Sequence, residues 1–183
     1  MYYMLECYGS PFEDATDLGE VPELPQVESW MAGRMIADPI PEPVRIPLDA
    51  ENPGALLEMF KSDVLVMTDR LVAALEEAGV DNLQTYAAEL VDPATNRVIG
   101  GYRLVNVVGV VSCAEIGARA EEGALARLDF DGAPIDARRA RGFLMFRLAE
   151  SLSAVVVRQE VRDHLLAKGF DMLTFVPPEE WIG

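Results

Sequence analysis

The sequence predicts an α+β fold with a mixed, mostly antiparallel sheet and two repeated strand–helix–strand units on one shared core. A pattern of apolar residues, glycine and aspartate at residues 65–83 returns at residues 155–173, ninety positions later and without a gap. A hairpin pattern separates the two copies. Half of the residues are hydrophobic, which is enough for a substantial core. We therefore expect a single domain over residues 1–183, with repeat units at 63–91 and 154–176.

The first 62 residues form an acidic, proline-rich part of the chain. Residues 2–8 mix aromatic, aliphatic and polar residues, end before a Gly-Ser-Pro turn, and predict a strand. Residues 10–43 hold eight acids, many prolines and one base, Arg34, so we expect irregular structure there. Trp30 is either a pin that fixes this loop to the core or an exposed anchor for a partner. Residues 44–48 predict another strand, and residues 56–60 of the following connector predict one helical turn.

The two repeat units differ at the start of their helices. In the first unit an apolar strand at 64–67 leads to Thr68, a good N-cap residue, and Gly79 is suited to end the helix. In the second unit Arg158 replaces the threonine, so the capping side chain is lost, while Gly169 still provides the stop.

The remaining segments are shorter. Residues 83–91 and 98–108 flank a turn at 92–96 and predict a β-hairpin. We expect residues 110–114 to extend or follow it, a helical turn or loop at 115–124, and strands at 125–130 and 143–148. Pro177 and Pro178 discourage further regular structure.

The composition predicts a soluble, cytoplasmic protein. The longest apolar run, residues 104–111, is too short to span a bilayer, and the first residues lack the basic region of a secretory signal. Cys7 and Cys113 have no metal-type spacing and are expected to be buried thiols.

The charge is strongly negative and unevenly distributed. There are 31 acids and 15 bases, and residues 1–91 hold 18 of the acids but only 4 of the bases. Such a surface repels nucleic acid and favours a basic partner, although acidity also serves solubility alone.

No motif for catalysis is present in the sequence. His164 is the only histidine, and no nucleophile elbow, phosphate-binding loop or calcium loop occurs. We expect no enzymatic activity, no metal and no cofactor.

Three stretches in combination resemble a known family: residues 65–79, residues 102–107, and residues 146–148 leading to 155–157 and 165–169. They are similar to a bacterial family first catalogued as a domain of unknown function and also classed as an immunity-protein family, the eleventh in the polymorphic-toxin survey. The resemblance covers about residues 55–176. It implies a small cytoplasmic protein that binds and neutralises a cognate toxin.

We expect this neutralisation to work by occlusion, with acidic and aromatic side chains covering a basic surface. No nucleic acid or membrane is expected as a partner. The candidate protein-binding residues are Glu28, Trp30, Asp38 and Glu42 from the acidic loop, and Tyr102, Arg103, Asn106, Arg147 and Glu150 from the family-like strands. The last five have a structural alternative, as buried hydrogen-bonding groups.

Two other functions remain open. A cleft between the two units could bind a small molecule or support a reaction, and convergence of Arg103, Asn106 and Arg147 would favour that hypothesis. Alternatively, the protein is a non-catalytic partner in a larger assembly.

Overall fold

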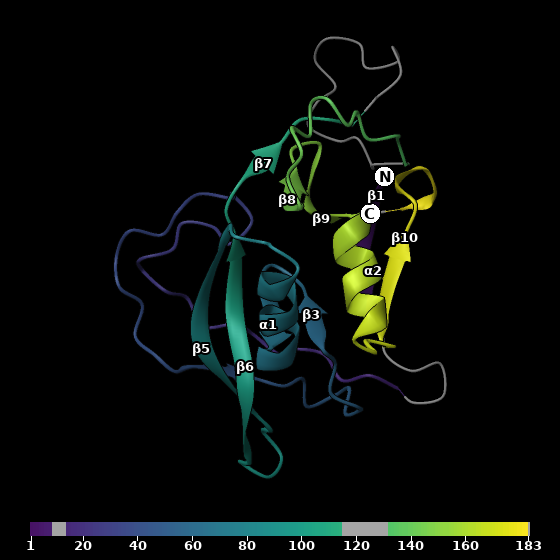
Figure 1. The fold of residues 1–183 in the computed structure, drawn as a ribbon. Helices are drawn as coiled ribbons and strands as arrows, with labels where there is room; N and C mark the ends of the chain where they lie inside the picture. The colour runs from purple at the N-terminus through teal and green to yellow at the C-terminus, as the bar shows by residue number, and fades with distance from the viewer. Residues whose placement is uncertain (9–13, 115–131, 183) are drawn as a thin grey trace.

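The computed structural model describes residues 1–8, 14–114 and 132–182. In these ranges the chain forms two five-stranded sheets and two α-helices that lie side by side (Figure 1). The α+β class and the mostly antiparallel pairing are confirmed, but there are two sheets where the sequence suggested one. The predicted helical turn or loop at 115–124 and the predicted strand at 125–130 lie outside the described residues.

The first sheet comes from the first half of the chain and has the order β2-β5-β6-β4-β3. Its centre is the predicted hairpin, whose arms pair antiparallel from Leu83 opposite Val107 to Val91 opposite Val98. Only the edge strand β2 runs parallel to its neighbour. The strands are β2 (Val44–Pro47), β3 (Met59–Lys61), β4 (Leu65–Thr68), β5 (Leu83–Val91) and β6 (Val98–Val107).

The prediction of a helical turn at residues 56–60 is wrong, because strand β3 begins within that range. Met59 packs into the cluster between the sheets, whereas Phe60 packs into the cluster on the outer face of the first sheet. Neighbouring residues that enter opposite layers follow the period of two that defines a strand.

The second sheet has the order β10-β1-β9-β8-β7 and combines both ends of the chain. The N-terminal strand β1 lies in its interior, antiparallel to β9 on one side and to β10 on the other. β7 is a short parallel edge strand beside β8. The strands are β1 (Tyr2–Cys7), β7 (Val110–Val111), β8 (Met145–Leu148), β9 (Ser151–Arg158) and β10 (Leu173–Val176).

The helices are α1 (Asp69–Glu77) and α2 (Gln159–Ala167), whose bounds lie ninety positions apart. Thr68 caps α1 as predicted, with its hydroxyl oxygen accepting the Leu71 amide at 3.1 Å, and α2 has no side-chain cap. Gly79 and Gly169, at φ 92° and 74°, follow the two helices in the left-handed conformation that turns the chain back.

In both sheets the strand before the helix and the strand after it are separated by a third strand. β6 lies between β4 and β5, and β1 lies between β9 and β10. Neither segment is therefore a closed strand–helix–strand unit, since each needs a strand from elsewhere to complete its sheet. The duplication itself stays a prediction.

One apolar cluster lies between the two sheets and beneath both helices. The cluster includes alternate residues of the strands and one face of each helix: Leu65, Met67, Val155 and Val157 from the strands, and Leu71, Leu75, Val161 and Leu165 from the helices. Two further clusters cover the outer faces, one beneath the N-terminal loop and one beneath the C-terminus. The loop thus packs on the first sheet and the C-terminus on the second.

The C-terminus is more ordered than its prolines suggested. A short 3-10 helix, η1 (Pro178–Glu180), forms there, because proline is well tolerated at the start of a helix. It places Trp181 in the core, where the indole nitrogen donates to the carboxylate of Glu6 at 2.6 Å. Among the described residues, no helix is long and apolar enough to cross a membrane.

Candidate functional site

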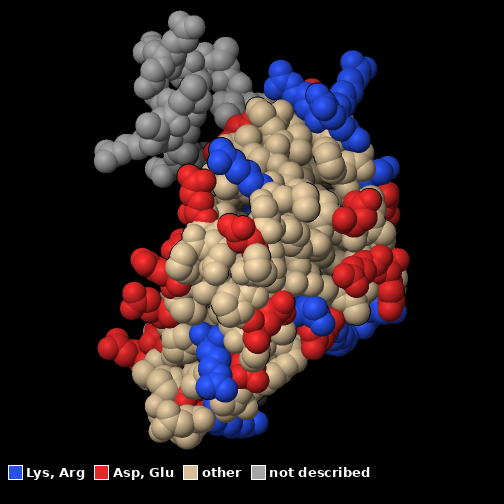
Figure 2. Space-filling model, turned by 90° about the vertical axis from the view of Figure 1, so that its left-hand side faces the viewer, with Lys and Arg blue, Asp and Glu red and all other residues tan. Residues whose placement is uncertain are grey.

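A groove of about 950 Å³ lies between the acidic loop, described over residues 14–43, and the turn that precedes β4. Among the described residues, apolar side chains line it together with four acids, Glu20, Glu23, Glu28 and Asp63, and none of these lining residues is lysine or arginine. The loop lies at the left of Figure 1, and Figure 2 shows that side of the molecule, with acidic side chains spread over it. The groove can therefore accept apolar and cationic groups together.

Backbone contacts with the edge of the first sheet hold the irregular loop in place. Leu18 forms a bridge with Leu48, and the Gly19 amide donates to the Pro47 carbonyl at 2.8 Å. At Gly54 an added Cβ would lie 2.2 Å from the Asp14 carbonyl oxygen, so only glycine allows this approach. The groove thus rests on a backbone that is tied to β2 although it has no regular structure.

Every third residue from Leu18 to Val27 faces inward. The apolar residues Leu18, Val21, Leu24 and Val27 pack against the outer cluster of the first sheet. The acids between them remain at the surface. This spacing gives the groove an apolar floor and an acidic rim.

Trp30 is a buried wall of the groove rather than an exposed anchor. It is 8% exposed and packs edge-on against Tyr86, with ring centroids 5.9 Å apart. The interpretation of Trp30 as a pin between loop and core therefore describes its place in the structure. The ring still lines the groove and can contact an occupant there.

The other three loop candidates are exposed but are not gathered in one place. Glu28 lines the groove and pairs with Arg34 at 3.4 Å, with both side chains exposed. Glu42 accepts a hydrogen bond from the Ala87 amide on β5, and Asp38 is an exposed residue outside the lining of the groove. Of the predicted acids, only Glu28 belongs to the groove.

Tyr102 and Arg103 have structural partners on the first sheet. The buried Tyr102 hydroxyl donates to the Leu57 carbonyl at 3.0 Å, and burial, aided by the negative charge of Glu58, raises its pKa to about 12. Arg103 pairs with Asp69 of α1 at 2.7 Å. Both side chains tie neighbouring segments to β6.

Asn106 joins the first sheet to the acidic loop through hydrogen bonds of its side chain. Only 1% exposed, it donates through its side-chain amide to the Arg34 carbonyl at 2.8 Å and to Gln84 at 3.0 Å. Gln84 in turn accepts the Ile36 amide at 2.8 Å. These bonds fix residues 34–36 beside β5 and β6.

Arg147 and Glu150 lie on the other sheet, at the β8–β9 hairpin. The guanidinium of Arg147 donates to the Leu152 carbonyl at 2.7 Å, while its Nε and second terminal nitrogen have no hydrogen-bond partner among the described residues. Burial lowers the Arg147 pKa to about 10. Glu150 accepts a hydrogen bond from Ser112 at 2.6 Å. The nine predicted residues thus lie in separate places, and the strand candidates do not extend the groove.

The sequence analysis missed Glu20, Glu23 and Asp63. For Glu20 and Glu23 the signal was present, because they lie between apolar residues that recur every three positions and pack inward. Trp30 and the net charge of the loop are stronger signals in the sequence than this spacing, and they indicate single residues.

In the described ranges, the cysteine and histidine side chains considered next are not arranged for nucleophilic catalysis or for metal binding. Burial raises the pKa of the Cys113 thiol to about 12, with Glu150 and Asp136 adding to the shift, so this thiol stays protonated. His164 lies on α2 with Nε2 3.7 Å from the carboxylate of Glu77. No group of histidine, cysteine and acidic residues in the described parts of the chain is arranged to hold a metal ion.

No model of a known protein family matches the chain, and no curated protein matches it either. Membership of the immunity-protein family is therefore a proposal.

Proposed function

We propose that this protein binds a basic protein through the groove in its acidic loop. The observation that carries the proposal is the lining of the groove, which combines apolar side chains with four acids and has no lysine or arginine. A bound segment with an apolar side chain flanked by cationic side chains would bury the apolar side chain in the groove and pair its cations with the acids. A neutral or an acidic segment would leave the acids of the groove without cationic partners.

Two physical effects would act together in such binding. Apolar contact with the floor and with Trp30 supplies most of the affinity, because a few well-packed anchors dominate protein interfaces. The negative charge of the first half of the chain speeds association with a basic partner, and salt weakens that effect.

The family resemblance adds the nature of the partner. On this proposal the partner is a cognate toxin in the cytoplasm, and the protein neutralises it by covering its basic functional surface, without catalysis of its own. The support is the match between the groove and the charge that a nucleic-acid-cleaving or otherwise basic toxin presents.

A small-molecule site or an enzymatic cleft between the two helix-bearing segments is less well supported. That alternative expected Arg103, Asn106 and Arg147 to converge. Arg103 pairs with Asp69, Asn106 bonds the loop, and Arg147 bonds Leu152 on the second sheet. Between the helices lies the shared apolar cluster.

Charge reversal in the groove tests the proposal. The variant carries Glu20→Lys, Glu23→Lys and Glu28→Lys, and the control carries Glu76→Lys, Asp171→Lys and Glu179→Lys, which are exposed elsewhere and change the net charge equally. The probe is a peptide that alternates lysine and leucine, titrated at low and moderate salt. We expect the wild type and the control to bind it, and the groove variant to bind at least about tenfold more weakly.

Equal binding by the groove variant and the control would contradict the groove as the site. A second arm tests neutralisation. A basic protein retained from the native host by the wild type, and not by the groove variant, should lose its own activity when the wild type is added. A retained protein that keeps its activity would instead support the non-catalytic assembly partner.

A further inference from the structure

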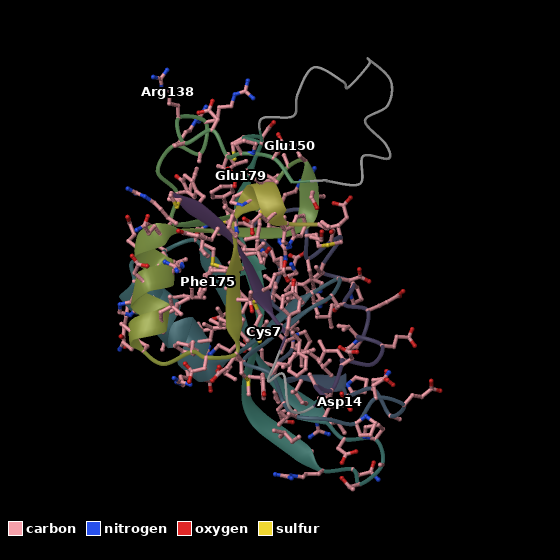
Figure 3. All side chains as sticks on the ribbon, turned by 90° about the vertical axis from the view of Figure 1, so that its right-hand side faces the viewer. Cys7, Asp14, Arg138, Glu150, Phe175 and Glu179 are labelled. Atoms are coloured by element: carbon pink, nitrogen blue, oxygen red, sulfur yellow. The ribbon has the colours of Figure 1, made fainter. Side chains whose placement is uncertain are left out.

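A second charged surface, of opposite sign, lies on the turn of residues 136–143, which we call the basic turn. It carries Arg138, Arg139 and Arg141, all exposed, and Phe143, whose ring is 40% exposed. In Figure 2 a group of basic side chains stands at the upper right of the molecule, and in Figure 3 Arg138 points outward at the same end. Three of the fifteen bases of the chain thus occupy four consecutive positions.

Two of these arginines are unpaired in the part of the chain that the structure describes. Arg139 lies 3.8 Å from the carboxylate of Asp136, whereas Arg138 and Arg141 form neither an ion pair nor a side-chain hydrogen bond there. Acids outnumber bases by 31 to 15, and most other described arginines have an acidic partner. Within the described residues, the guanidinium groups of Arg138 and Arg141 are therefore not engaged by an acidic side chain.

The backbone beneath the arginines is held firmly. The Asp136 carboxylate accepts the Arg138 amide at 2.8 Å, and the Asp136 amide donates to the Cys113 carbonyl at 2.8 Å. Ala140 is fully buried in the outer cluster of the second sheet. Since the turn is anchored at both its start and its middle, little backbone conformational entropy is lost when a partner binds.

Arg141 adopts a backbone conformation that arginine disfavours. Its φ is +52°, and Gly142 follows at +78°. A residue with a side chain remains in the left-handed region only where its surroundings hold it there, and such positions concentrate at functional sites. Glycine would adopt the backbone conformation of position 141 with less strain. The presence of arginine there therefore indicates a role for its side chain.

We propose that the basic turn is a second protein-binding surface, which fits an acidic segment with an apolar side chain. Arginine pairs bidentately with carboxylates, and an exposed aromatic ring beside arginines matches the composition of interface centres. A nucleic acid fits less well, because two or three arginines neutralise few of its phosphates. This surface is independent of the groove, since the two carry opposite charges and lie on different sheets.

Two single variants and a matched control test this surface. Arg138→Glu reverses one available charge, and Arg141→Gly removes the other while it suits the backbone, so the turn keeps its shape. Arg97→Glu, on the exposed hairpin turn of the first sheet, is the matched control for Arg138→Glu. The probe is a labelled peptide that alternates glutamate and leucine, titrated at low salt, with a single-stranded DNA of equal charge as the comparison.

We expect saturable binding of the acidic peptide by the wild type and by Arg97→Glu. Binding should be about fivefold weaker in Arg138→Glu and measurably weaker in Arg141→Gly, and the thermal midpoint of Arg138→Glu should be unchanged. The groove variant should bind this peptide at least as tightly as the wild type does, whereas Arg138→Glu weakens its binding, which separates the two surfaces. The proposal is overturned if the peptide does not bind, if Arg97→Glu weakens it equally, or if the DNA binds more tightly.

Discussion

Arg147 has a fully buried guanidinium group, and within the described parts of the chain only one of its three nitrogens forms a hydrogen bond. A buried charge costs free energy unless a partner compensates it, and the lowered pKa of Arg147 reflects that cost. The residue therefore contributes packing volume more than favourable electrostatics.

The first prediction concerns this residue. Arg147→Met keeps an unbranched side chain of similar length and removes the buried charge, so we expect a free energy of unfolding equal to the wild type or about 1–4 kcal/mol higher. Urea unfolding monitored by circular dichroism measures it. Arg147→Ala, which leaves a cavity, is the contrasting variant and should be the less stable of the two. A strongly destabilised methionine variant would show that the single bond to Leu152 outweighs the burial of charge.

Cys113 supports a second prediction at the same scale. Only a thiolate reacts readily with a disulfide reagent, and burial holds the Cys113 pKa at about 12, well above its ordinary value. At pH 8 we expect Cys113 to react with a thiol reagent only after the protein is unfolded, whether by urea or by heat. Labelling followed by peptide mass mapping reads out this site separately from Cys7. Rapid labelling of Cys113 in the native protein would contradict the burial.

At the scale of elements, the two helices share a core and are joined at their ends. Arg70 of α1 donates to the carbonyls of Lys168 and Gly169, which follow α2, at 2.8 and 3.1 Å. Its guanidinium also lies 4.0 Å from the centre of the Phe170 ring. Lys168 donates to the Glu77 carboxylate in the opposite direction. These contacts fix the helices against each other at the surface of the shared cluster.

The cap of α1 gives a third prediction. Thr68 accepts the Leu71 amide and donates to Glu58 at 2.5 Å, so Thr68→Ala leaves a helix-terminal donor without its partner. We expect a loss of about 1 kcal/mol in the free energy of unfolding. Thr174→Ala, at an exposed position of β10, is the matched control and should change little. Equal values for the two variants in chemical denaturation would mean that the cap does not contribute.

The link between Glu77 and Lys168 gives a fourth prediction, which depends on pH. The hydrogen bond and positive charge of Lys168 hold the pKa of Glu77 below its ordinary value in the folded state. The unfolded state therefore binds more protons as the pH falls, so this contribution to stability is complete above the ordinary glutamate pKa and lost as the pH falls through the folded one. We expect Glu77→Gln to be less stable than the wild type at neutral pH and to approach it in acid. A difference that stays constant with pH would exclude the ionised pair as its source.

At the scale of the whole molecule, the net charge of −16 opposes the compact state, because folding brings like charges closer together. Raising the salt from about 0.01 M to about 0.15 M shortens the Debye length from about 30 Å to about 8 Å. We therefore predict that the thermal midpoint rises with sodium chloride over this range. The same salt should weaken binding of a basic partner, so stability and affinity should move in opposite directions. A midpoint that falls with salt would mean that the ion pairs outweigh the repulsion.

The candidate site was only partly predictable. Composition identified the acidic loop, and Trp30 and Glu28 do line the groove there. The chosen strand residues were polar positions in buried strands, where a hydrogen-bonding role within the fold is the usual outcome, as Tyr102 and Asn106 show. The basic turn was visible as a cluster in the sequence, but its unpaired arginines and its strained Arg141 were not.

Local signals in the sequence were sufficient for the elements that depend on near neighbours. The hairpin of β5 and β6, the cap at Thr68 and the glycine ends of both helices each depend on residues a few positions apart, so their patterns can be read directly. The helical turn expected at 56–60 failed because a strand partner, β4, decided the conformation of β3.

Apart from the hairpin of β5 and β6, only the tertiary structure decided which strands are neighbours. Nothing near β1 in sequence indicates that it lies between β9 and β10, or that buried Glu6 holds Lys61 from one sheet and Trp181 from the C-terminus. The groove likewise needs the loop to meet residues 62–64, which are distant in sequence. Such contacts form because burial of the apolar faces of sheets and helices lowers the free energy of a strand arrangement that closes the core. This gain in free energy depends on the whole chain and is not encoded in any one segment.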